Sequence, residues 1–125
     1  MKTLFFIPFL FMCSIVIGQS SVIIGTPIRI GNIEVAQNDF PTDMNWANAN
    51  DSCAKLGEGW RLPTKDELHL LFEKKDEIGG FVAQYYWSST IYDQGYAWVE
   101  QFEKYSMTMV NNPKYLNFVR AVRSF

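Results

Sequence analysis

His69 is the one side chain whose type alone suggests metal or acid-base chemistry, since the sequence contains no other histidine. It falls beside the apolar stripe that Leu68, Leu71 and Phe72 form at helical spacing, so we expect a solvated helix residue. No partner for metal or nucleophile chemistry is evident, and no HExxH, GxSxG or P-loop spacing occurs. The sequence therefore predicts no catalytic residue, no metal site and no cofactor.

Cys53 is the second chemically capable side chain, because a free thiol can act as a nucleophile or form a disulfide. It shares a helical stripe with Trp46, Ala49 and Leu56, which indicates a small buried hydrophobe. Two sharper alternatives are an intermolecular disulfide and a reactive thiol. Lys55 is the only cationic residue close by, which gives an activated thiolate little support.

Charged side chains offer two further possibilities. Arg61 could bind an anion, but Asp66 and Glu67 follow closely, so a structural ion pair is the expected role. Arg120 and Arg123 are expected on a solvated or ion-paired strand face. Four carboxylates could ligate calcium, although they show no loop-ligand spacing: Asp39, Asp43, Asp51 and Asp93.

Aromatic residues crowd the second half of the chain and give the one indication of a binding surface. Tyr92, Tyr105 and Tyr115 lie at or beside predicted turns, where they cannot all be buried. Together with Asp93 they are the candidate binding residues. Exposed aromatic rings beside polar side chains suit a sugar ring or a protein partner.

The elements that must position these residues follow from periodicity and turn chemistry. Residues 28–30 and 33–35 alternate around Gly31-Asn32, which suits a type II′ hairpin. Asn45 is a plausible cap for a helix from Trp46 to Leu56, with Gly57 beyond its end. Later strands are expected over residues 85–90, 96–102, 106–110 and 118–125.

The segment Gly59-Trp60-Arg61-Leu62-Pro63-Thr64 turns an extended run into a second helix. Pro63 disfavours the α region for the residue before it, and Thr64 with Glu67 three residues later forms the pattern of a capping box. The helix is expected over residues 65–75. Two strands, two helices and then several strands indicate an α+β fold, in which pairing the last strand beside the first would hold the C-terminus.

The chain begins with a predicted secretory signal peptide over residues 1–18, in which Lys2 precedes an apolar run. A lipoprotein signal using Cys13 is the alternative, but Met12 is not the small residue such a site requires. Residues 19–125 suit one domain. Its mildly acidic balance and lack of a basic patch argue against nucleic acid, and no second apolar run could span a membrane. We expect a secreted protein, extracellular or periplasmic.

Four ordered motifs resemble the bacterial Lcl C-terminal domain family (DUF1566), which is related to the Fibrobacter major paralogous domain. The Gly59–Leu68 segment is similar to that family's WRLPT signature, and residues 86–90 (YWSST) to its aromatic strand. Residues 44–53 resemble its first helix, and residues 119–123 its closing VRCVR strand. The resemblance implies a C-type-lectin-like α+β fold: two helices packed on antiparallel sheets, with the N- and C-terminal strands adjacent. Structural roles are then expected for Cys53, Trp60, Arg61, Thr64, Glu67 and Trp87.

Ala121 stands where the motif has cysteine, so the disulfide that the motif would imply with Cys53 cannot form. The EPN and WND calcium signatures of lectins are absent as well. The resemblance favours a non-catalytic binding or structural module for an unidentified extracellular glycan or protein. The alternative is a small secreted enzyme using Cys53, by analogy with formylglycine-generating domains that carry a similar RLPT segment.

Overall fold

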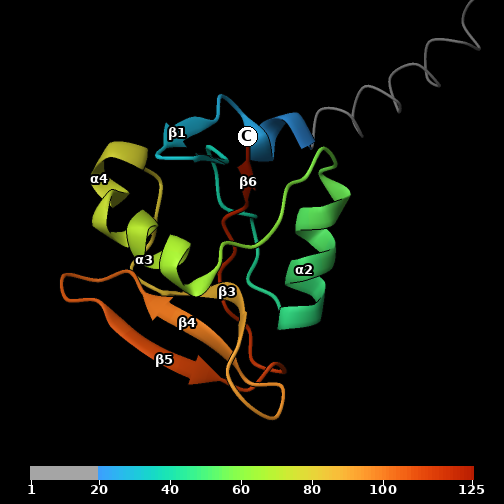
Figure 1. Cartoon of the computed structure of the whole chain (residues 1–125), viewed down its shortest axis with the longest axis vertical. Coiled ribbons are helices and arrows are strands. Elements are labelled where there is room, and N and C mark those ends of the chain that lie inside the picture. The colour runs from blue at the N-terminus through green and yellow to red at the C-terminus, as the bar shows by residue number, and fades with distance from the viewer. Residues whose placement is uncertain (1–19) are drawn as a thin grey trace, which may run out of the picture.

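The computed structural model describes residues 20–125, and the predicted signal peptide lies outside these residues. Two three-stranded antiparallel sheets lie at opposite ends of the molecule, with helices between them (Figure 1). After helical residues 20–24, the elements follow in this order: β1 (Ile28–Ile30), β2 (Ile33–Val35), α2 (Trp46–Lys55), α3 (Lys65–Glu73), α4 (Lys75–Ile78), β3 (Tyr85–Ile91), β4 (Ala97–Gln101), β5 (Met107–Asn111) and β6 (Val122–Ser124).

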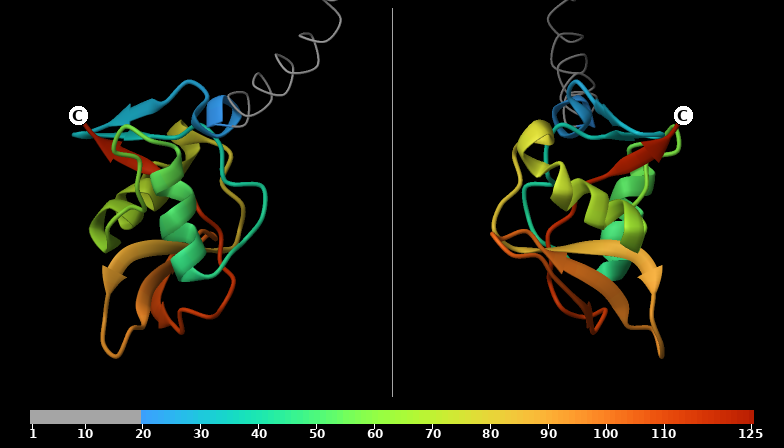
Figure 2. Two further views of the ribbon diagram at one scale, coloured as in Figure 1. Left: turned by 90° about the vertical axis from the view of Figure 1, so that its right-hand side faces the viewer. Right: turned by 60° about the vertical axis from the view of Figure 1, so that its left-hand side comes forward.

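The first sheet has the order β1-β2-β6, so the closing strand pairs with β2 and not with β1 as the sequence suggested. Gly31, the first residue of the turn between β1 and β2, has φ +58°, and the second residue, Asn32, has a negative φ. This combination fits the expected type II′ turn, since a type I′ turn needs positive φ at both residues. The N-terminal hairpin and the C-terminal strand therefore lie side by side (Figure 2).

Both long helices begin at the predicted caps. The Asn45 side chain accepts from the Asn48 N–H, and Thr64 and Glu67 form the reciprocal capping box. The second helix ends earlier than predicted, at Glu73, because Lys74 adopts φ −103° and ψ 14°. The short α4 that follows turns Ile78 into the core, where it is 7% exposed.

The closing segment 117–121 runs through the middle of the molecule and contacts both halves. Its first residue, Asn117, exchanges backbone hydrogen bonds with Met44. Further backbone hydrogen bonds join the segment to Phe40 before α2 and to Tyr85 and Trp87 on β3. The WRLPT segment then joins the two sheets: Arg61 exchanges backbone bonds with Val122, while Ser89 donates to the Pro63 carbonyl at 2.8 Å. These bonds satisfy backbone groups that would otherwise be buried unpaired.

Arg120 is ion-paired, which is one of its two expected roles, but it is fully buried, so the alternative of a solvated strand face is wrong. Its Nε donates to Asp39 Oδ1 at 2.6 Å, and its other nitrogens donate to the carbonyls of Ala36 and Gly79. The Tyr86 hydroxyl donates to the second oxygen of Asp39. Burial raises the pKa of Asp39, and Arg120 and Tyr86 oppose that shift only in part.

The core divides into two clusters, one packed around α2 and one around α3. Cys53, Trp60, Trp87 and Ala121 belong to the first cluster, and Cys53 and Ala121 have no exposed surface. The indole N–H of Trp87 donates to the Met44 carbonyl at 2.7 Å. The helix residue and the closing-segment residue that a disulfide would join thus share one packed region.

Replacing Thr64 by alanine should lower the free energy of unfolding by about 1 kcal/mol, because the Glu67 N–H loses its cap. Denaturant unfolding followed by circular dichroism measures this change. Thr42→Ala is the matched control, since Thr42 is an exposed threonine outside any helix cap. A midpoint equal to that of the unmodified protein would contradict a stabilising capping box.

Ala121→Cys should form a disulfide with Cys53 on oxidation, provided that the two Cα atoms lie about 4.4–6.8 Å apart. The bridge would close a loop of about seventy residues and should stabilise the fold by up to about 4 kcal/mol, less any strain. Mass spectrometry detects the bond, and the reduced form of the same variant is the control for thermal unfolding. Two free thiols in the oxidised, folded monomer would show that the two positions are not adjacent.

Candidate functional site

The hairpin between β3 and β4 presents several aromatic side chains to solvent. Its turn is held by the Tyr92 N–H donating to the Tyr96 carbonyl at 2.7 Å, and by the Tyr96 N–H donating to Asp93 at 2.9 Å. Gln94 and Gly95 both have positive φ, which lets the chain reverse over so few residues. Tyr92 is 60% exposed and Tyr96 39% exposed.

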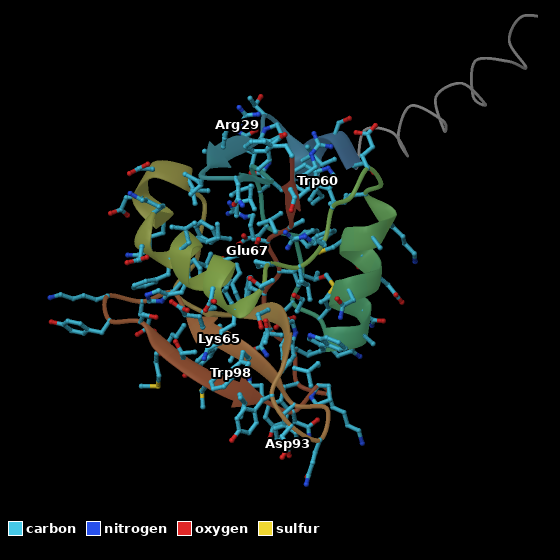
Figure 3. All side chains as sticks on the ribbon, in the orientation of Figure 1. Arg29, Trp60, Lys65, Glu67, Asp93 and Trp98 are labelled. Carbon is cyan, nitrogen blue, oxygen red and sulfur yellow. The ribbon has the colours of Figure 1, made fainter. Side chains whose placement is uncertain are left out.

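Trp98 on β4 anchors this surface. The Tyr92 and Trp98 rings pack edge to face, with 5.2 Å between centroids and 88° between planes. Lys65 Nζ lies 3.8 Å from the centroid of the Trp98 ring. Lys65 is the first residue of α3, and its N–H donates to Thr90 Oγ1 on β3 at 2.8 Å. We call this surface the aromatic tip; it consists of Lys65, Tyr92, Asp93, Tyr96 and Trp98. Figure 3 labels three of these residues, Lys65, Asp93 and Trp98, at the end of the second sheet.

The candidate binding residues from the sequence do not form one site. Tyr92 and Asp93 belong to the aromatic tip. Tyr115 lies in the turn after β5, at the same end of the sheet, because Asn111 pairs with Ala97 at the start of β4. Tyr105 is 77% exposed but lies in the β4–β5 loop, at the opposite end of β4.

Sequence reasoning missed the contribution of Lys65, Tyr96 and Trp98 to the tip. Alternation along β4 gives a signal for Trp98, since Ala97 and Val99 are buried on the other face of the strand. The position of Lys65 had no local signal, because it depends on α3 packing across the second sheet.

Arg61 forms the expected structural ion pair. Its two terminal nitrogens donate to the Glu67 carboxylate at 2.7 and 3.0 Å, and one of them also donates to Ser124 Oγ at 3.0 Å. The hydrogen bond from Arg61 is the largest cause that lowers the pKa of Glu67. Since Glu67 also caps α3, the pair connects this helix to β6, and both Arg61 nitrogens already have partners.

His69 is an exposed residue of α3, as the sequence predicted, but it also has a polar partner that the sequence did not indicate. Its Nδ1 lies 2.9 Å from Oε2 of Glu100, a carboxylate that is almost completely buried, and the Ser106 hydroxyl donates to the same oxygen at 2.5 Å. A histidine, a serine and a carboxylate therefore meet on the α3 side of the second sheet. In a hydrolase the imidazole lies between serine and carboxylate so that it can take the hydroxyl proton. Here the carboxylate lies between them, so the cluster does not activate Ser106.

Cys53 is placed poorly for chemistry. It has no exposed surface, and burial raises the pKa of its thiol to about 12. The thiolate is the nucleophilic form, so this environment suppresses reactivity at neutral pH. Within residues 20–125, no three His, Cys, Asp or Glu side chains gather as a possible metal site. Asp39, one of the four possible calcium ligands, is paired with Arg120 instead.

An open hollow of about 480 Å³ lies along α2. The helix contributes a polar stripe of Asn48, Asp51, Ser52 and Lys55, and Leu116 of the turn after β5 forms part of the wall. The hollow is shallow and polar, and it shares no residue with the aromatic tip. No helix in the described part of the chain is long and apolar enough to cross a membrane.

Cys53 should react with Ellman's reagent slowly in the native protein and rapidly in denaturant, because the fold hides the thiol and raises its pKa. Absorbance at neutral pH measures both rates. The denatured sample is the internal control for reagent and protein concentration. Rapid native labelling would contradict the burial of Cys53 and would favour a catalytic thiol.

Comparisons with solved structures show the fold, and a family model shows the family. No curated protein sequence matches the chain. Among solved structures it is similar to EMS16, "an Antagonist of collagen receptor integrin alpha2beta1", with a TM-score of 0.58, and to rhodocetin, with 0.57. Each is 10% identical, and the alignments cover 79% of this chain and 97% of theirs.

EMS16 and rhodocetin are C-type-lectin-like snake-venom proteins, so the predicted C-type-lectin-like fold is confirmed. The family model of the Lcl C-terminal domain matches residues 30–123, from the end of β1 into β6. This range includes the WRLPT segment, the second sheet and the closing segment, whose backbone hydrogen bonds connect the two sheets. The chain therefore belongs to the Lcl C-terminal domain family.

Proposed function

We propose that this protein is a secreted, non-catalytic binding module whose ligand surface is the aromatic tip. The observation that carries the proposal is the pair of exposed rings, Tyr92 and Tyr96, on a short hairpin in which Tyr92 packs against Trp98. Exposed aromatic rings with few rotatable bonds lose little entropy on binding and are enriched at recognition surfaces. The predicted signal peptide supports the secreted location.

A glycan is the ligand class that the tip suits best. A sugar ring presents one apolar face and several hydroxyls, and the tip offers aromatic rings beside a carboxylate, Asp93, and an ammonium group, Lys65. Few polar groups around an apolar surface fix the orientation of a small ligand. The tip is also narrow: its three aromatic residues come from one hairpin of nine residues, 91–99.

A protein partner is the second candidate, because the similar structure EMS16 is described as an antagonist of an integrin receptor. A protein interface usually buries about 800 Å² on each partner. The tip alone is small for such an interface, so a protein would also have to contact neighbouring surface such as Tyr115, which is 61% exposed at the same end of the sheet.

The absence of catalysis is supported by two arrangements. The Cys53 thiol is buried with a raised pKa, and Glu100 separates His69 from Ser106. An enzyme of the formylglycine-generating type using Cys53 would need substrate to reach a side chain that has no exposed surface. These features favour binding over the enzyme alternative.

Tyr92→Ala should weaken glycan binding by about five- to thirtyfold, corresponding to the 1–2 kcal/mol that truncating an aromatic contact commonly costs. A glycan array with the unmodified protein first identifies a ligand, and calorimetry then gives the affinity of each variant. Tyr105→Ala is the matched control, because it removes an exposed tyrosine at the other end of β4.

Equal loss of affinity in both tyrosine variants, or none in Tyr92→Ala, would contradict the aromatic tip as the ligand surface. If no glycan binds, a pull-down from the envelope of the producing cell, using both variants as bait, tests the protein alternative. A partner lost by Tyr92→Ala and retained by Tyr105→Ala would place a protein on the tip in place of a glycan.

A further inference from the structure

One edge of the second sheet is open. In the described part of the chain β5 pairs with β4 alone, and it lies on the outside of the molecule (Figure 1). The opposite edge of this sheet, β3, is covered by the closing segment. The Trp87 N–H donates to the Phe118 carbonyl at 3.0 Å, and the Phe118 N–H donates to the Tyr85 carbonyl at 2.9 Å. An open edge leaves backbone donors and acceptors available to another strand.

The open edge lacks the devices that normally keep such strands apart. Natural sheets protect exposed edges with charged residues, proline or a bulge. Residues 106–112 carry no charge and no proline, and five consecutive β5 residues pair with β4 without a register shift. Met107 is 54% exposed and Met109 38% exposed, so the edge is also apolar.

We propose that a second copy of this chain pairs with the open edge, antiparallel and about a twofold axis at Thr108. The sequence Met107-Thr108-Met109 reads the same in both directions. An antiparallel pairing centred on Thr108 therefore sets Met107 opposite the partner subunit's Met109, and the two Thr108 residues opposite each other. Thr–Thr and apolar cross-strand pairs are favourable, and no like charges meet across the paired strands.

The faces of the sheet fit this pairing. Register places Val99 opposite Met109 and Trp87 opposite Val99, so these three residues form one row on the core face. Met107 lies on the same face, where the Tyr85 hydroxyl approaches its sulfur at 3.9 Å. The twofold would extend this apolar row into the partner and cover both methionines. The contact is isologous, so it closes as a dimer and does not continue into a fibre.

The position of the axis makes a disulfide test possible. Thr108→Cys should form a symmetric intermolecular disulfide on mild oxidation, because antiparallel partners have Cα atoms about 4.5–5.5 Å apart and disulfides span about 4.4–6.8 Å. Thr42→Cys, at an exposed threonine outside β5, is the matched control and should form no intermolecular disulfide. Met107→Cys mixed with Met109→Cys should cross-link better than either variant alone.

A charge substitution at Thr108 tests the same pairing without a cross-link. Sedimentation of the unmodified chain should show a reversible, concentration-dependent dimer. Thr108→Lys should abolish this dimer, because it sets two ammonium groups opposite each other across the axis. Thr42→Lys is the control and should leave the dimer intact. Circular dichroism and thermal unfolding confirm that each variant is folded. A monomer at every concentration overturns the proposal. A dimer that survives Thr108→Lys, or that Thr108→Cys fails to cross-link, lies elsewhere and overturns it equally.

Discussion

The burial of Arg120 is the constraint on which the rest of the structure depends. A buried guanidinium is very costly unless its donors are satisfied, and its partners here come from segments far apart in the chain. Asp39 and Ala36 lie after β2, and Gly79 follows α4; the Phe81 ring lies 4.0 Å from the charged group. The segment after β2, the end of α4 and the closing segment must therefore come together before this charge can be buried.

The WRLPT segment connects that interior to the candidate ligand surface. Its backbone pairs with β6, its proline carbonyl accepts from β3, and the helix that it caps begins with Lys65. Lys65 then lies on Trp98, which supports the aromatic tip. The segment thus has a positioning role. By fixing the start of α3 against β3 and β6, it holds Lys65 over Trp98 in the aromatic tip.

Features that depend on neighbouring residues could be predicted from sequence, and features that depend on distant ones could not. The caps at Asn45 and Thr64 and the Gly31 turn involve three or four residues, so their patterns are complete locally. The pairing of His69 with Glu100 and of Lys65 with Trp98 spans more than thirty positions. Arg120 was assigned to a solvated or ion-paired face because its buried partner, Asp39, lies eighty-one positions away.

The alanine at position 121 has a consequence for where and how this domain can reach its native state. Within residues 20–125 Cys53 is the only cysteine, and its thiol is enclosed by the core. Folding of this part of the chain therefore involves no oxidation step and no disulfide isomerase, and its stability does not change with the thiol–disulfide balance of the surroundings. The native structure of residues 20–125 therefore does not depend on an oxidising compartment.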